Sequence, residues 1–189
     1  MLKSIIVSSA FVLGLSAASY SLDATHSSVG FGIKHMGIST VKGEFKEFTG
    51  SYVLDDTTGA LKELKGDVVV KSLTTGVEKR DGHLLSADFF DAAQYPKISF
   101  AMTQNKMKGK NGKILGTMTM HGVSKPIELV ATVAGPAVDP WGTKKSAVSL
   151  KGVINREDFG LKWNKTLEAG GFLVGKDVTL TIELEGNGQ

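Results

Sequence analysis

Apolar and polar residues alternate at a period of two over most of the chain. Val29, Phe31 and Ile33 share one face of the first such segment, and residues 41–45 repeat the pattern. The alternation is unbroken over residues 178–184, near the end of the sequence. A period of two places successive side chains on opposite faces of a half-buried strand. The pattern therefore predicts a chain built mainly from β-strands.

Short turns separate the predicted strands. Asn111-Gly112 predicts a tight hairpin between a strand that starts at Ile98 and a partner that returns through Met120. His121-Gly122 predicts the turn that follows. Short connections favour antiparallel pairing, because parallel neighbours need long crossovers. We expect about eight strands, paired antiparallel.

Residues 77–95 interrupt the alternation. The acidic residues near the start of this segment and Ser86 as an N-cap predict one or two short helices, which Pro96 ends. Eight strands and one helical excursion can close as a barrel or pack as a sandwich. Several of the 23 glycines fall within the predicted strands, which favours a tightly curved sheet. A barrel of this size has an interior that can hold one small ligand.

The first eighteen residues have the layout of a secretory signal peptide. Lys3 gives a positive start, residues 5–15 are an apolar run, and small residues follow from Ser16 to Ser19. The run is too short to span a bilayer of about 30 Å. We expect a signal peptide over residues 1–18, cleaved after Ala18 or Ser19, and one periplasmic domain over residues 19–189.

Composition narrows the class of function. The chain has 189 residues, a formal net charge of +3 and no cysteine. The charge is too small for a typical nucleic-acid-binding surface, and without cysteine there are no disulfides or thiolate metal sites. The sequence contains no phosphate-binding loop, no serine nucleophile motif and no paired metal-ligand motif. We interpret it as a protein that is not an enzyme and that holds no metal and no cofactor.

Specific motifs give the sequence a resemblance to a known family. Three segments carry it most clearly, namely Arg80-Asp81-Gly82-His83-Leu84, then residues 116–126, then Arg156-Glu157-Asp158-Phe159-Gly160-Leu161. Together with residues 22–35, 41–45, 88–91 and 95–100, they resemble the YceI-like proteins in order and spacing. The resemblance implies a lipocalin-like antiparallel β-barrel with an elongated apolar cavity and a helix near its mouth. It also implies export, frequent dimerisation, and a polyisoprenoid or other long-chain amphiphile as ligand.

The candidate binding residues are apolar side chains at strand starts, on inward strand faces and in the helical excursion. For the cavity wall they are Phe31, Ile33, Phe45, Phe48, Phe89, Phe90, Phe100, Met102, Met118, Met120, Phe159 and Trp163. A plain solid core would use the same residues, and the resemblance favours a lined cavity. For the ligand head group the candidates are His35, Arg80, His83 and Arg156. An arginine fork can hold a phosphate, carboxylate or amide, although it can equally pair with a carboxylate and pin a loop.

Three functions therefore remain in competition. The leading hypothesis is a periplasmic carrier of a long-chain isoprenoid or fatty amphiphile, acting as a homodimer. The alternatives are an enzyme that acts on such a lipid, and a stress or adhesion protein whose barrel is filled. Lys106, Lys108, Lys110 and Lys113 crowd the predicted hairpin. They could contact an anionic membrane surface transiently during lipid exchange, or simply keep the hairpin solvated.

Overall fold

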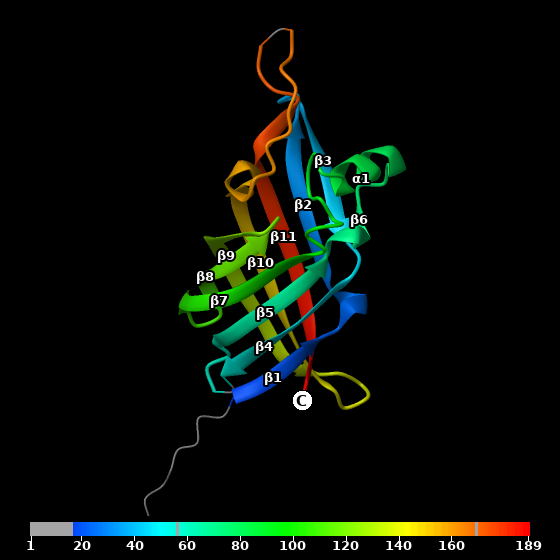
Figure 1. Cartoon of the computed structure of the whole chain (residues 1–189). Helices are drawn as coiled ribbons and strands as arrows, with labels where there is room; N and C mark the ends of the chain where they lie inside the picture. Colours follow the sequence, from blue (N-terminus) through cyan, green and yellow to red (C-terminus); the bar gives the residue numbers. More distant parts are fainter. Residues whose placement is uncertain (1–16, 56, 169) are drawn as a thin grey trace, which may run out of the picture.

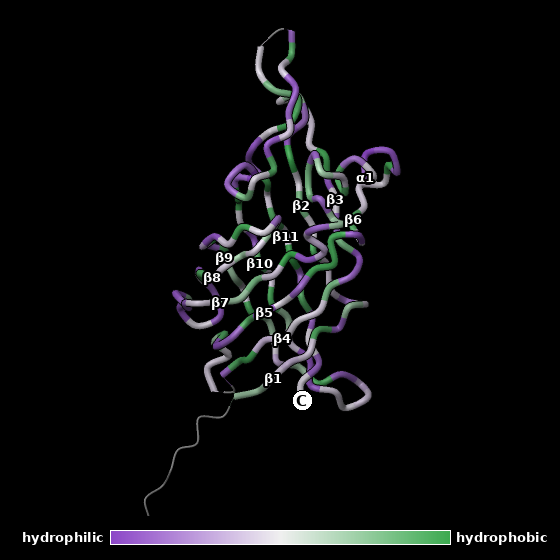
Figure 2. The backbone as a smooth tube through the Cα atoms, in the orientation of Figure 1, coloured by the Kyte–Doolittle hydropathy of each residue, from purple (hydrophilic) through white to green (hydrophobic). Residues whose placement is uncertain are grey.

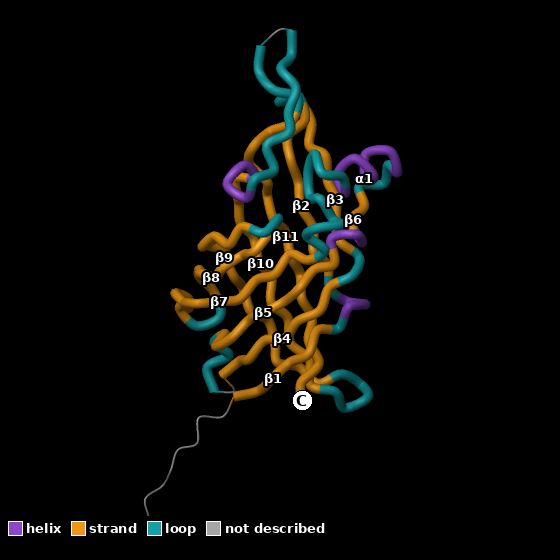
Figure 3. The backbone as a smooth tube through the Cα atoms, viewed as in Figure 1, coloured by secondary structure: helices purple, strands orange, loops and turns teal. Residues whose placement is uncertain are grey.

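The computed structural model describes residues 17–55, 57–168 and 170–189. Most of these residues lie in strands, and one short α-helix interrupts them (Figures 1 and 3). The elements are β1 (Ala17–Leu22), η1 (Ala24–His26), β2 (Ser28–His35), β3 (Ser39–Phe45), β4 (Phe48–Asp55), β5 (Leu61–Val69), η2 (Val70–Ser72), β6 (Leu73–Thr74), α1 (Glu78–Leu85), β7 (Lys97–Lys108), β8 (Asn111–Met120), β9 (Val123–Val138), β10 (Lys144–Asn155), η3 (Arg156–Phe159) and β11 (Val174–Gly188). The predicted signal peptide lies almost wholly outside the described residues.

Eight of the strands close into an antiparallel barrel. Their order is β1-β4-β5-β7-β8-β9-β10-β11, and β11 pairs with β1 to complete the ring. The lower part of β11 pairs with β1 and its upper part with β2, which carries β3 and the short β6 beyond the ring. The predicted barrel of about eight antiparallel strands with one short helix is confirmed.

The hydrophobic alternation has the expected structural basis. Hydrophilic and hydrophobic residues alternate along the strands (Figure 2), and in β11 both Leu180 and Leu184 are buried. Inner glycines make room for aromatic rings, because a Cβ on Gly43 would lie 2.4 Å from Cζ of Phe31. This close approach explains why a residue without a side chain faces the phenylalanine across the β2–β3 pair.

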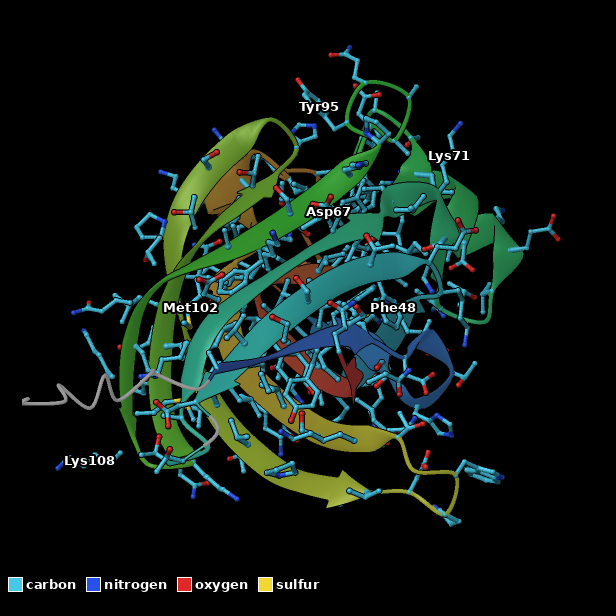
Figure 4. All side chains as sticks on the ribbon, turned by 90° about the horizontal axis from the view of Figure 1, so that it is seen from below. Phe48, Asp67, Lys71, Tyr95, Met102 and Lys108 are labelled. Carbon is cyan, nitrogen blue, oxygen red and sulfur yellow. The ribbon has the colours of Figure 1, made fainter. Side chains whose placement is uncertain are left out.

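The lower end of the barrel is filled by side chains. The rings of Tyr20 and Tyr52 stack with their centroids 5.1 Å apart, and both are almost fully buried. The Tyr52 hydroxyl donates to the carbonyl of Ser146 at 2.7 Å. Seen from below, the ring of strands surrounds this packed interior while Lys108 points outward (Figure 4).

Two local predictions were wrong. The β7–β8 turn is formed by Gly109 and Lys110, because Lys108 pairs with Asn111 and Asn111-Gly112 lies inside β8. Gly109 has a φ of +61°, which a glycine at the first central position of a hairpin turn adopts without strain. Ser86 is the C-cap of α1 and not an N-cap, and its hydroxyl donates to the carbonyl of His83 at 2.8 Å.

Candidate ligand-binding site

An apolar cavity of about 320 Å³ occupies the barrel above its filled lower end. Strands from every side of the barrel contribute to its wall, and α1 and the segment after it cover one side of its upper end. The wall includes Leu129 on β9 and Leu150 on β10, as well as Leu173 and Val174 where β11 begins. The segments at the upper end of the barrel, α1, the residues after it and the residues before β11, also border the cavity, and we refer to this end as its mouth.

Most of the candidate wall residues line this cavity. They are Phe31, Ile33, Phe45, Phe48, Phe89, Phe90, Phe100, Met118, Met120 and Trp163. They come from β2, β3, β4, β7 and β8, from the segment after α1, and from the segment after η3. All four head-group candidates, His35, Arg80, His83 and Arg156, also border the cavity.

Met102 and Phe159 do not line the cavity, although both face the interior, because Met102 packs against the core and Phe159 belongs to it. Met102 pairs with Gly116, and the ring of Phe100 lies over that glycine, so Phe100 supplies the wall there. A register shift follows Met102 directly, and its side chain packs against the core. Phe159 ends η3 and is 1% exposed within the core, where a strand alternation rule does not apply.

Most of the aliphatic part of the wall was not predicted, because apart from Ile33 the predicted wall consisted of aromatic residues and methionines. Val178, Leu180, Ile182 and Leu184 all line the cavity from β11. These four residues occupy alternate positions of the sequence, so the period of two already placed them on one face of the strand. Period two tells which residues share a face, but not whether that face meets a void or packed side chains.

Three aromatic rings from two segments meet at the mouth. The Trp163 indole packs at 4.8 Å from the His83 ring and at 5.1 Å from the Phe89 ring, measured between centroids. His83 and Phe89 themselves lie 5.1 Å apart in an edge-to-face arrangement. This cluster joins α1 and the segment after it to the segment that follows η3. It covers the upper cavity with apolar surface.

Hydrogen bonds hold α1 against the barrel. The Asp81 carboxylate accepts from the backbone N–H of Thr75 at 2.9 Å and from the hydroxyl groups of Thr74 and Thr75. Burial raises the pKa of Asp81, but these hydrogen bonds outweigh it and the net pKa is lowered. Arg80 adds donors from Nε and Nη2 to the hydroxyl and carbonyl of Thr75, at 2.7 and 3.0 Å.

Arg156 is a buried cation beside the apolar wall. Its side chain is 3% exposed, and Nε donates to the carbonyl of Gly175 at 2.9 Å. Nη1 donates to the carbonyl of Leu161. Nη2 is buried and has no hydrogen-bond partner among the described residues. Burial lowers the pKa of Arg156, but an arginine remains protonated at any physiological pH.

One cluster outside the cavity has metal-binding residue types. Asp23, His26 and Glu185 bring their ligand atoms within 4.8 Å of one another. The Lys145 ammonium lies 3.1 Å from both carboxylates, so it already supplies the cation that they would attract. Hydrogen bonds from Thr25, His26 and Lys145, in that order of effect, lower the pKa of Asp23. This arrangement ties the β1–β2 corner to β10 and β11.

The lysine-rich hairpin lies at the closed end of the barrel. Lys110 donates to the carbonyl of Gly135, next to the β4–β5 turn that contains Gly59. Lys113 pairs with Glu128 on the outer surface. The hairpin is therefore remote from the mouth. No helix in the described ranges is long and apolar enough to cross a membrane.

Comparisons with known proteins agree with this geometry. The family model of the YceI-like domain matches residues 20–186 of this chain. A UPF0312 protein from Enterobacter sp. (strain 638) is 37% identical over 172 residues, which cover 90% of this chain and 86% of that protein. The crystal structure of the Campylobacter jejuni YceI protein is 36% identical, with a TM-score of 0.69 over 82% of this chain and 88% of that chain. A polyisoprenoid binding domain from Saccharophagus degradans is 18% identical, with a TM-score of 0.67 over 90% and 98% of the two chains, a likeness of fold.

Proposed function

The chain belongs to the YceI-like family, and we propose that it is a carrier that binds the tail of a long-chain amphiphile, an isoprenoid or a fatty derivative, inside its barrel. The observation that carries this proposal is the apolar cavity of about 320 Å³ above the filled end of the barrel. The name of the polyisoprenoid binding domain from Saccharophagus degradans, which shares the fold, is consistent with it.

The driving force would be the removal of the tail from water. Each methylene group that enters an apolar environment gains about 0.8 kcal/mol, so roughly ten of them gain about 8 kcal/mol before the cost of ordering the chain. The wall combines rigid aromatic rings with the flexible Met118 and Met120. Methionine adapts its shape to irregular apolar partners, which suits a chain with branches or double bonds.

The cavity also distinguishes between the competing functions. A filled barrel would have no such chamber, so the stress or adhesion alternative has less support. An enzyme that acts on the lipid would need a nucleophile or an acid–base pair beside the tail. The polar residues of the described wall are two histidines, four basic residues, Thr49 and Ser99, and the rest of the wall is apolar. We propose binding without catalysis.

We further propose that the protein works in the periplasm after removal of residues 1–18. Ala17 and Ala18 pair with Asp55 and Leu54 in β1, so cleavage after Ala18 would leave residues 19–22 of that strand. N-terminal sequencing of the exported protein should begin at Ser19 or Tyr20. Recovery of intact Met1 from the cytosol would contradict this localisation.

A homodimer is proposed through the outer face of β9 and β10. Val130 and Val153 are 52% and 63% exposed on these neighbouring strands and offer apolar surface to a second copy of the chain. Light scattering over a wide concentration range should give twice the monomer mass. A monomer mass throughout would reject the dimer and leave the carrier function untouched.

Exchange of the lipid is proposed to occur at the mouth, against a membrane surface. Ile38 and Phe172 are 80% and 64% exposed at this end of the barrel. The N–H of Met36 donates to the carbonyl of Leu173 at 2.8 Å, which joins the two loops that carry them. The exposed Lys34 and Lys165 are close by in the sequence, a combination that favours an anionic lipid surface.

Native mass spectrometry of the protein purified from its own host tests the carrier proposal. We expect an added mass that corresponds to one long-chain lipid per chain and that disappears on denaturation. Protein that carries no lipid, and that takes up none from a total lipid extract after delipidation, would overturn the proposal.

A further inference from the structure

The guanidinium of Arg156 has one nitrogen without a function in the protein. Two of its three nitrogens donate to the carbonyls of Gly175 and Leu161, which holds the arginine beneath the segment between η3 and β11. Nη2 is buried without a hydrogen-bond partner in the described chain. Buried polar groups are normally satisfied, and an unsatisfied donor that also carries charge is among the most costly to leave.

No carboxylate compensates this cation closely. The nearest is Glu157, whose Oε1 lies 3.9 Å from Nη2, too far for a hydrogen bond, and whose side chain is 42% exposed. Asp158, the other acid of the motif, is exposed and forms no ion pair with Arg156 among the described residues. The alternative that Arg156 merely pins a loop through a carboxylate therefore does not account for Nη2.

The described wall offers no anion to balance Arg156. It includes no aspartate or glutamate, and the side chains of its two lysines, Lys34 and Lys65, are exposed to solvent. Arg80 spends its hydrogen bonds on the hydroxyl and carbonyl of Thr75, and no carboxylate of the described chain lies within 4.0 Å of it. Arg156 is therefore the buried cation of this wall that has both an unused donor and no anion close to it.

Resting on the proposed carrier function, we propose that the ligand has an anionic head, a carboxylate or a phosphate monoester, that accepts a hydrogen bond from Nη2 of Arg156. The head lies near the mouth, beneath the segment between η3 and β11, and the tail runs down towards Tyr20 and Tyr52. An anionic oxygen supplies both the missing acceptor and the missing negative charge. A neutral amide or alcohol supplies only the acceptor, because it leaves the buried charge unbalanced.

The test compares probes that share one tail and differ in the head. Delipidated protein is titrated with hexadecanoate, hexadecyl phosphate and hexadecanol below their aggregation limits, at about pH 8, where a carboxylic acid is ionised. We expect one or both anionic probes to bind at least about tenfold more tightly than the alcohol. The two anionic probes distinguish the carboxylate from the phosphate source of this chemistry.

The variant Arg156→Met identifies the group responsible. It should lose the preference for the anionic probes, measured as the ratio of their affinities to that for hexadecanol within the same variant. Arg156→Lys, which keeps the charge but not the fork, should retain part of that preference. Because both changes also remove donors to Gly175 and Leu161, the alcohol measurement shows whether the cavity remains intact.

The outcomes separate this inference from the function on which it rests. Equal binding of the anionic probes and the alcohol by the wild type overturns the anionic head but leaves the carrier function standing. The same holds for an anionic preference that survives in Arg156→Met, since another group would then be responsible. If none of the three probes binds, the carrier function itself fails.

Discussion

Tyr52 shows how a single polar group can be satisfied inside the closed end of the barrel. Its hydroxyl is within hydrogen-bond distance of both the carbonyl and the hydroxyl of Ser146, at 2.7 and 2.8 Å. Burial raises the pKa of Tyr52 to about 12, because the phenolate would lose its hydration. The folded protein therefore favours the neutral phenol at a pH where the unfolded chain would ionise.

This shift predicts a loss of stability in alkali that Tyr52→Phe removes. A group with a raised folded pKa contributes stability that is complete below its unfolded pKa of about 10 and is lost as the pH rises towards 12. The loss should reach roughly 2–3 kcal/mol for the wild type. Urea unfolding from about pH 9 to 12 measures it. Tyr52→Phe should start about 1–3 kcal/mol less stable, because Ser146 loses its partner, and then fall less steeply. Parallel pH curves for the two proteins would contradict the buried phenol.

The residue scale is also where sequence reasoning was weakest. The resemblance to the family brought Arg156 into the candidate set, but its unpaired Nη2 could not be read from the chain. The partners of Arg156 are backbone carbonyls of Leu161 and Gly175, and any residue type could supply them. Similarly, the position of Met102 depends on a register shift and on the ring of Phe100, neither of which has a local sequence signal.

At the scale of elements, the strands were predictable and the connections were less so. Alternation identified β11 because one of its faces carries Leu180 and Leu184, which are buried and alternate with more exposed residues of the other face. The β7–β8 turn was misplaced by two residues because Gly109-Lys110 and Asn111-Gly112 are both acceptable turns. Pairing with β9, where Asn111 lies opposite Thr132, keeps Asn111 in the strand. The tertiary arrangement therefore decided between two local solutions.

We expect Asp81→Asn to loosen α1, which covers one side of the upper cavity and is held to the residues before it by Asp81. The amide cannot accept all three hydrogen bonds from Thr74 and Thr75, so α1 should open more often. We expect several-fold faster amide exchange over residues 78–85 and several-fold faster release of a bound alkyl probe. Because the pKa of Asp81 is lowered, its contribution exists above the unfolded pKa of about 3.9 and is lost as the pH falls through the folded value.

Glu128→Gln is the matched control for this prediction. The Glu128 carboxylate pairs with Lys113 on the outer surface of β8 and β9, away from α1. It should exchange and release the probe as the wild type does. Equal rates for all three proteins would show that Asp81 does not hold the cover.

We expect the end of the barrel that carries Ile38 and Phe172 to bind the membrane. The double variant Ile38→Ser and Phe172→Ser removes the two most exposed apolar side chains there. Its cosedimentation with vesicles that contain phosphatidylglycerol should fall several-fold, while binding of a soluble alkyl probe stays unchanged. Trp141→Ser is the control, since Trp141 is 87% exposed in the β9–β10 connection at the opposite end. If only Trp141→Ser lost vesicle binding, the membrane contact would lie at the closed end of the barrel, which would contradict this prediction.

At the scale of the whole molecule, the barrel is divided along its axis. The lower part is a solid core around Tyr20 and Tyr52, which accounts for stability without any disulfide. The upper part contains the cavity in place of packed side chains, and the segments around α1 and after η3 cover that cavity. The barrel and its family were accessible from sequence because strand alternation and motif spacing extend over the whole chain. The presence of the cavity could not be predicted from this pattern, because filled and hollow barrels share the same alternation.

The most direct measurement of the central claim is the amount of lipid retained per folded chain in Met118→Asp. Met118 lines the cavity and is 7% exposed, so the new carboxylate would face the tail without a partner. Met118→Leu, a swap that usually costs less than about 1.5 kcal/mol, controls for the change of shape. Thr117→Asp places the same charge on the neighbouring, exposed position of β8. With circular dichroism confirming the fold, we expect the wild type, Met118→Leu and Thr117→Asp to retain their lipid and Met118→Asp to lose nearly all of it. A folded Met118→Asp that carries a full complement of lipid would contradict the assignment of the cavity as the binding site.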